Sequence, residues 1–139
     1  MMRIAAAAVV LMCAVSCGQR PSVQPRCSSV QVIAVTDSVL RHGGADTLRF
    51  GRLHSGETAV RRFVLSNRRD VPMVIIRHET TCRCSSFDYT RRPVMAGDST
   101  EVTCTFDSSG EYGWQFKLVK LWLSEAEEPL RIFIEAEVE

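Results

Sequence analysis

The sequence lacks an excess of charge of either sign. Its 17 lysines and arginines stand against 16 aspartates and glutamates, which leaves a formal net charge of +1. A nucleic-acid-binding domain normally carries a clear basic excess, so we expect no nucleic-acid partner. The chain also lacks an apolar run of the roughly 20 residues that a membrane-spanning helix needs, because the run at residues 4–15 is too short. From Val30 onward no segment repeats apolar residues at helical spacing, so we expect a β-rich domain.

The sequence also lacks a recognisable catalytic set. It has no Gly-x-Ser-x-Gly turn, and no spacing ties Ser66, His54 and Asp70 together as a triad. Three other carboxylates are dispersed over the β segments: Asp88, Glu101 and Asp107. Dispersed carboxylates are more often solvated surface than an acid and base pair. We therefore expect a protein that is not an enzyme.

The N-terminus has the pattern of a lipoprotein signal peptide. Arg3 is followed by the apolar run and then by "AVSC", which resembles a bacterial lipobox ending at Cys17. Cys13 fits less well, because Met12 precedes it where a small residue is wanted. We expect residues 1–16 to be removed and Cys17 to carry lipid, with ordinary signal cleavage as the alternative.

Residues 17–29 read as a tether and residues 30–139 as one domain. The tether is polar, contains two prolines and Cys27, and shows neither helical nor strand periodicity. The predicted location is the cell envelope, facing the periplasm, with the membrane as a partner through the lipid anchor. No acidic residue directly follows Cys17, which favours the outer membrane over the inner one.

The domain reads as a succession of strands. Seven β-branched and aromatic runs are separated by turn residues, as expected for a two-sheet antiparallel β-sandwich. Within the run at residues 114–124, the segment 118–123 is apolar on both parities, so this strand is predicted to be central. Acidic residues late in the run at 130–138 suggest a solvated edge. The predicted core includes Phe50, Phe63, Ile75, Val102 and Phe106.

Several of these runs resemble an uncharacterised bacterial family, domain-of-unknown-function family 1573. The stretches are "LRFGRLHSGETAVRRFVLSNRRDVPMVI", "TTCRCSS" and "PVMAGDSTEVTCTFD", and the resemblance covers about residues 47–139. It implies an immunoglobulin-like fold related to Hydin-type domains, which are mostly interaction modules, and no assigned activity. An envelope protein or a glycan is then the expected partner, of unknown identity. The chain departs from the family pattern at Arg83 and Arg69, where the family has Gly, at Thr81, where it has Ser, and at His78, near a usually apolar position.

The cysteines outside the signal and the lipid site leave three interpretations open. Four remain, namely Cys27, Cys82, Cys84 and Cys104, and an even number in an exported chain favours disulfides. We favour this structural role, with Cys82 or Cys84 bridged to Cys104 and the other cysteine free or paired with Cys27. No cofactor is then needed.

The first alternative is a soft-metal site. His78, Cys82 and Cys84 share a parity and could face one side of an unbroken strand, with Cys104 as a fourth ligand for Zn²⁺ or Cu⁺. The C-x-C spacing differs from the usual zinc pattern. The second alternative is a thiol-redox role for the Cys82-x-Cys84 pair, near the positive charge of Arg83.

Trp114 and Trp122 share a parity on one predicted strand and could form an exposed aromatic stripe. Tryptophans in a sandwich are more often core residues, so we expect both to be buried.

Overall fold

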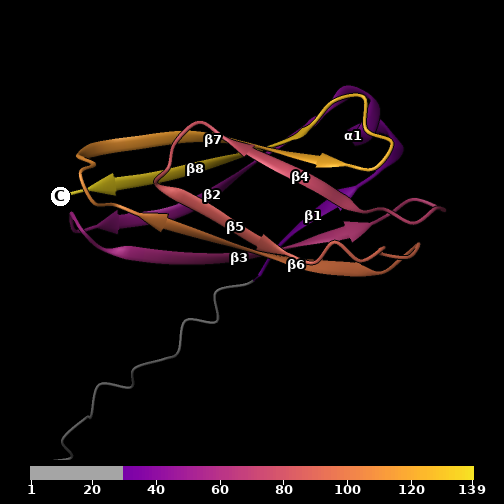
Figure 1. Cartoon of the computed structure of the whole chain (residues 1–139), viewed down its shortest axis with the longest axis horizontal. Coiled ribbons are helices and arrows are strands. Elements are labelled where there is room, and N and C mark those ends of the chain that lie inside the picture. The colour runs from indigo at the N-terminus through magenta and orange to yellow at the C-terminus, as the bar shows by residue number, and fades with distance from the viewer. Residues whose placement is uncertain (1–29) are drawn as a thin grey trace, which may run out of the picture.

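The computed structural model describes residues 30–139, which fold into two β-sheets packed face to face (Figure 1). Within this part of the chain no helix is long and apolar enough to span a bilayer. The elements in chain order are β1 (Gln31–Val35), α1 (Asp37–His42), β2 (Gly44–Leu53), β3 (Thr58–Asn67), β4 (Ile75–Thr80), β5 (Ser85–Tyr89), β6 (Ser99–Asp107), β7 (Gly113–Leu123) and β8 (Leu130–Val138).

Each sheet has four strands. One has the order β1-β3-β6-β5 and the other β2-β8-β7-β4. Most neighbours are antiparallel, but β1 pairs parallel to β3 and β2 pairs parallel to β8. The predicted all-β sandwich is thus confirmed, with eight strands where about seven were expected, because residues 85–89 form a strand that the sequence pattern did not reveal.

The core lies between the sheets and is built by alternation along the strands. In β8, for example, Leu130, Ile132 and Ile134 face inward and are buried, while the residues between them are more exposed. The predicted core residues Phe50, Phe63, Ile75, Val102 and Phe106 are all buried. That part of the sequence prediction is confirmed.

Two predictions about strand position have opposite outcomes. β7 lies inside its sheet, between β8 and β4, as its apolar sequence suggested. β8 is also an interior strand, so the prediction of a solvated edge at residues 130–138 is wrong. The acidic residues of β8 face outward and pair with arginines of β2, as Glu135 does with Arg49 at 3.6 Å.

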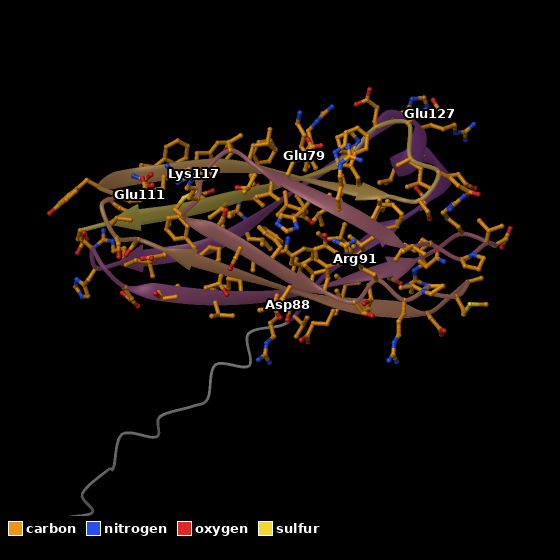
Figure 2. All side chains as sticks on the ribbon, viewed as in Figure 1. Glu79, Asp88, Arg91, Glu111, Lys117 and Glu127 are labelled. Carbon is orange, nitrogen blue, oxygen red and sulfur yellow. A yellow bond between two sulfur atoms is a disulfide. The ribbon has the colours of Figure 1, made fainter. Side chains whose placement is uncertain are left out.

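The short helix α1 was not predicted. It connects β1 of one sheet to β2 of the other and begins at Thr36, whose hydroxyl accepts a hydrogen bond from the Val39 amide at 3.3 Å. With six residues and one buried side chain, Leu40, it is too short to produce a helical pattern. It lies at the end of the sandwich opposite Glu111 and Lys117 (Figure 2).

Candidate functional site

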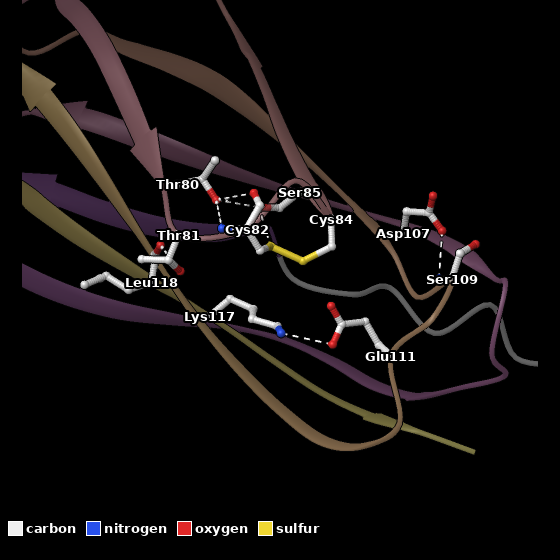
Figure 3. The surroundings of a disulfide bond; sticks show 10 residues. All are labelled: Thr80, Thr81, Cys82, Cys84, Ser85, Asp107, Ser109, Glu111, Lys117 and Leu118. Carbon is white, nitrogen blue, oxygen red and sulfur yellow. Dashed lines mark hydrogen bonds and ion pairs between the residues drawn. A yellow bond between two sulfur atoms is a disulfide. The ribbon is translucent and has the colours of Figure 1, made fainter.

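Cys82 and Cys84 lie in the tight connection between β4 and β5 and are joined to each other. β4 ends at Thr80 and β5 begins at Ser85, so residues 81–84 must reverse the chain. The sulfur atoms are 2.00 Å apart and the two Cα atoms 5.3 Å apart, as in a disulfide (Figure 3).

Side chains at the two strand ends hold this connection in place. The Thr80 hydroxyl donates to the carbonyl oxygen of Cys82 at 3.0 Å and lies 3.0 Å from the Ser85 hydroxyl. The Cys82 amide in turn donates to the Thr80 hydroxyl at 3.3 Å. On the other side, the carbonyl oxygen of Cys84 accepts a hydrogen bond from the Asp107 amide at 2.8 Å. The loop is therefore a structured turn that presents the disulfide at one end of the sandwich.

Solvent can reach this disulfide. Both cysteines are half-buried, and Arg83 between them is exposed. The ion pair between Lys117 and Glu111, 3.0 Å long, lies beside the disulfide (Figure 3). The connection that carries the disulfide is therefore a partly exposed part of the surface.

The expected bridge to Cys104 is wrong. Cys104 is a free thiol, fully buried in β6, and its partner in register on β5 is Phe87 rather than a cysteine. Burial raises the pKa of this thiol to about 12, so it stays protonated. The sequence correctly placed Cys104 on the core side of its strand. The expectation failed because β5, which was not recognised, begins just after Cys84 and pairs Phe87, rather than a cysteine, with Cys104. Cys27 and the lipid-site residue Cys17 lie outside the described residues.

The four proposed metal ligands do not converge. Among residues 30–139 no group of three or more histidine, cysteine, aspartate or glutamate side chains could hold a metal ion. The equal parity of His78, Cys82 and Cys84 would matter only in an unbroken strand, and the strand ends at Thr80. The imidazole of His78 instead shares a hydrogen bond of 3.1 Å with the Tyr89 hydroxyl.

The residues considered as a triad do not meet either. Ser66 is buried near the C-terminal end of β3, whereas His54 lies in the turn before β3 begins. They are at opposite ends of one strand.

A second cluster lies on the outer face of the β2-β8-β7-β4 sheet. Trp114 stacks on Phe116 with ring centroids 5.3 Å apart, and Phe116 stacks on Phe133 at 4.8 Å. We call these three residues the aromatic row. Trp114 is 65% exposed and Phe116 is 46% exposed.

The prediction that Trp114 is a core residue is therefore wrong. Trp122 is half-buried, with the guanidinium of Arg77 4.8 Å from its ring centroid. The sequence could have indicated an outward position for Phe133. This residue shares its parity with Arg131 and Glu135 and so belongs to the polar face of β8.

Comparisons with known proteins identify a family and a fold. The family model described as "Protein of unknown function (DUF1573)" matches residues 43–138. No curated protein matches the chain at a significant level.

Solved structures with a similar fold include three from two bacteria. A protein of unknown function from Porphyromonas gingivalis W83 has a TM-score of 0.58 at 19% identity, with 66% of this chain and 43% of that chain covered. The VesB protease of Vibrio cholerae has a TM-score of 0.52 at 15% identity, with coverages of 67% and 30%. The secreted serine protease VesC from Vibrio cholerae gives 0.51 at 9% identity, with coverages of 65% and 21%. The match spans less than half of each of these longer chains, and at such identities it shows the fold alone.

Proposed function

The chain belongs to the DUF1573 family of proteins of unknown function, and we propose that it is a lipid-anchored module of the cell envelope that binds another envelope component without catalysis. The observation that carries this proposal is the exposed aromatic row on the outer face of β7 and β8.

The aromatic row is unusual for a surface that meets only water. Along a strand with one face in solvent, inward apolar residues normally alternate with outward polar ones. Here a tryptophan and two phenylalanines are stacked together on the outward face. Clustered exposed aromatic side chains mark binding surfaces, and tryptophan is the residue type most enriched among those that dominate binding energy. The row therefore supports a role in recognition.

The N-terminal sequence supports the location. Lipidation at Cys17 would attach the chain to a membrane facing the periplasm, with the outer membrane favoured. Residues 18–29 would then allow the domain to lie at most about 40 Å from the lipid. Partners within the envelope, whether proteins or glycans, are in reach of such a tether.

Photo-crosslinking in intact cells tests this function. A benzophenone amino acid in place of Trp114 should give a discrete adduct, because benzophenone inserts into C–H bonds of proteins and glycans alike. The matched control carries the same group in place of Val60, which is 53% exposed on the other sheet, and should give none. Identical adduct patterns at the two positions, or none at either, would contradict the proposal.

A second function, reversible thiol–disulfide exchange at Cys82 and Cys84, is favoured by one observation. The disulfide closes a very short loop and its two cysteines are only partly buried, so it adds less to stability than a bond across a long loop and is not sealed from a thiolate in solution. An incoming thiolate would attack one sulfur and displace the other as a thiolate, and a second thiol would complete the two-electron reduction.

Equilibration with glutathione buffers, followed by alkylation and mass measurement, tests this second function. Exchange requires that the pair shift from bonded to free thiols within the range of about −120 to −300 mV in which redox-active pairs work. The Cys104→Ala variant is the control and should titrate identically. A pair that stays bonded below about −300 mV would be structural.

A further inference from the structure

The aromatic row borders a hollow on the same outer face. The hollow has a volume of about 300 Å³ and is lined by Trp114, Gly51, Arg49, Arg52, Glu135 and Glu137. We propose that it is a binding site for a neutral sugar unit of a glycan, which rests on the proposed binding function and names its ligand class.

The strand register explains how the hollow is built. Trp114 of β7 lies opposite Glu137 of β8, and Glu137 lies opposite Arg52 of β2. A second such row on the same face consists of Phe116, Glu135 and Arg49. Two parallel rows, each with an aromatic, an acidic and a basic residue, thus cross three neighbouring strands.

The backbone between these rows carries no outward side chain at one point of β2. Gly51 lies there, at a β-bulge where it pairs with Ala136 of β8, whose own side chain faces the core. Gly51 has a φ of +78°, which favours glycine, and a Cβ atom placed on it would meet nothing within 4 Å. The hollow is therefore bordered by the side chains of the two rows, and no side chain projects from Gly51 into the space between them.

The polar groups in the hollow have hydrogen-bonding capacity to spare. Arg49 lies 3.6 Å from Glu135, and Arg52 lies 3.6 Å from Glu137 and 3.4 Å from Glu139. Direct charge-assisted hydrogen bonds are shorter, about 2.7–2.9 Å, and exposed pairs of this length are weakly coupled. Guanidinium donors and carboxylate acceptors are thus available to a ligand.

These features match a neutral sugar better than a charged ligand. The two arginines and two glutamates of the lining balance, and the carboxylate of Glu139 beside Arg52 adds negative rather than positive charge, so the hollow does not attract a polyanion. Sugar hydroxyls both donate and accept hydrogen bonds, so adjacent hydroxyls can bond a guanidinium and a carboxylate side by side. The C–H groups of a pyranose carry partial positive charge and pack on the electron-rich face of an aromatic ring such as Trp114.

Binding of the purified full chain to immobilised neutral hexasaccharides tests the inference. The probes consist of glucose, mannose, xylose, galactose or N-acetylglucosamine units, with hexagalacturonate as the charged control. We expect saturable binding to at least one neutral probe and little to hexagalacturonate. Trp114→Ala should weaken binding by about tenfold or more, and Arg52→Ala by about fivefold, in variants with unchanged thermal melting.

Tryptophan fluorescence provides the matched control. Trp122→Phe leaves Trp114 as the only tryptophan, so the bound sugar should shift its emission while the affinity stays unchanged. Trp114→Phe leaves only Trp122, which lies outside the hollow, and its emission should not respond.

Two outcomes would overturn the inference: the folded chain binds none of the neutral probes, or Trp114→Ala binds them as the wild type does. If no sugar binds but crosslinking at position 114 captures an envelope protein, the proposed binding function stands and its partner is a protein. Failure of both the sugar and the crosslinking experiments would remove both proposals.

Discussion

Breaking the disulfide between Cys82 and Cys84 should destabilise the domain only slightly. The bond closes a loop of three residues, counting both cysteines. In the chain-entropy model such a loop contributes about 1.6 kcal/mol to the free energy of unfolding at 25 °C. A bond from Cys82 to Cys104 would close a loop of about 23 residues and contribute about 3.4 kcal/mol.

Thermal unfolding with and without a phosphine reductant measures this difference. For a domain of this size each kcal/mol shifts the midpoint by about 4 °C, so reduction should lower it by about 6 °C rather than about 14 °C. The Cys82→Ser/Cys84→Ser double variant should match the reduced wild type and show no further response to reductant.

The Cys104→Ala variant is the control. Because Cys104 is a free thiol in the structure, this variant should lose as much stability on reduction as the wild type does. A response to reductant that disappears in Cys104→Ala, or a decrease of about 14 °C in the wild type, would refute the assignment of the disulfide.

Three further predictions concern the core, the buried thiol and the anchor. Phe63 is fully buried, so Phe63→Ala should lower the free energy of unfolding by about 3–5 kcal/mol in a denaturant titration, and a loss below about 1 kcal/mol would contradict its position in the core. Burial raises the pKa of Cys104 from 9.0 to about 12, so its thiol favours the folded state below pH 9. As the pH rises from 9 to 12, the wild type should therefore lose up to about 1.4 kcal/mol of stability per pH unit relative to Cys104→Ala, and equal pH profiles of the two would count against this. Cys17→Ser should move the protein from the membrane fraction to the soluble fraction of the cell, as immunoblotting would show, and an unchanged membrane fraction would exclude lipid attachment at that residue.

The fold was predictable because its information is local and repeated. Alternation of apolar and polar residues is a property of each strand, so Phe63, Val102 and Phe106 could be assigned to the core without knowledge of their partners. The family pattern added the order of the strands along the chain. The strand at residues 85–89 was missed because serine and aspartate dilute the alternation of two aromatic residues.

The candidate sites depended on which strands become neighbours. Parity along β7 and β8 could have shown that Trp114 and Phe133 face outward once the sheet was known, but not that their rings meet through Phe116. The position of Arg52 beside Glu137 depends on the parallel pairing of β2 with β8, two strands that are far apart in the sequence.

The sequence by itself determined the β-sandwich, the core positions of Phe63, Val102 and Phe106 and the closeness of Cys82 to Cys84, because these follow from neighbouring residues. The tertiary structure alone decided that the two cysteines bond to each other and that Cys104 remains a buried free thiol. It also decided that the acidic residues of β8, an interior strand, lie beside arginines of β2 and next to Trp114 of the aromatic row, around one hollow. The physical reason is that strand pairing is a long-range choice, made by the burial of both sheets together, and no local pattern contains it.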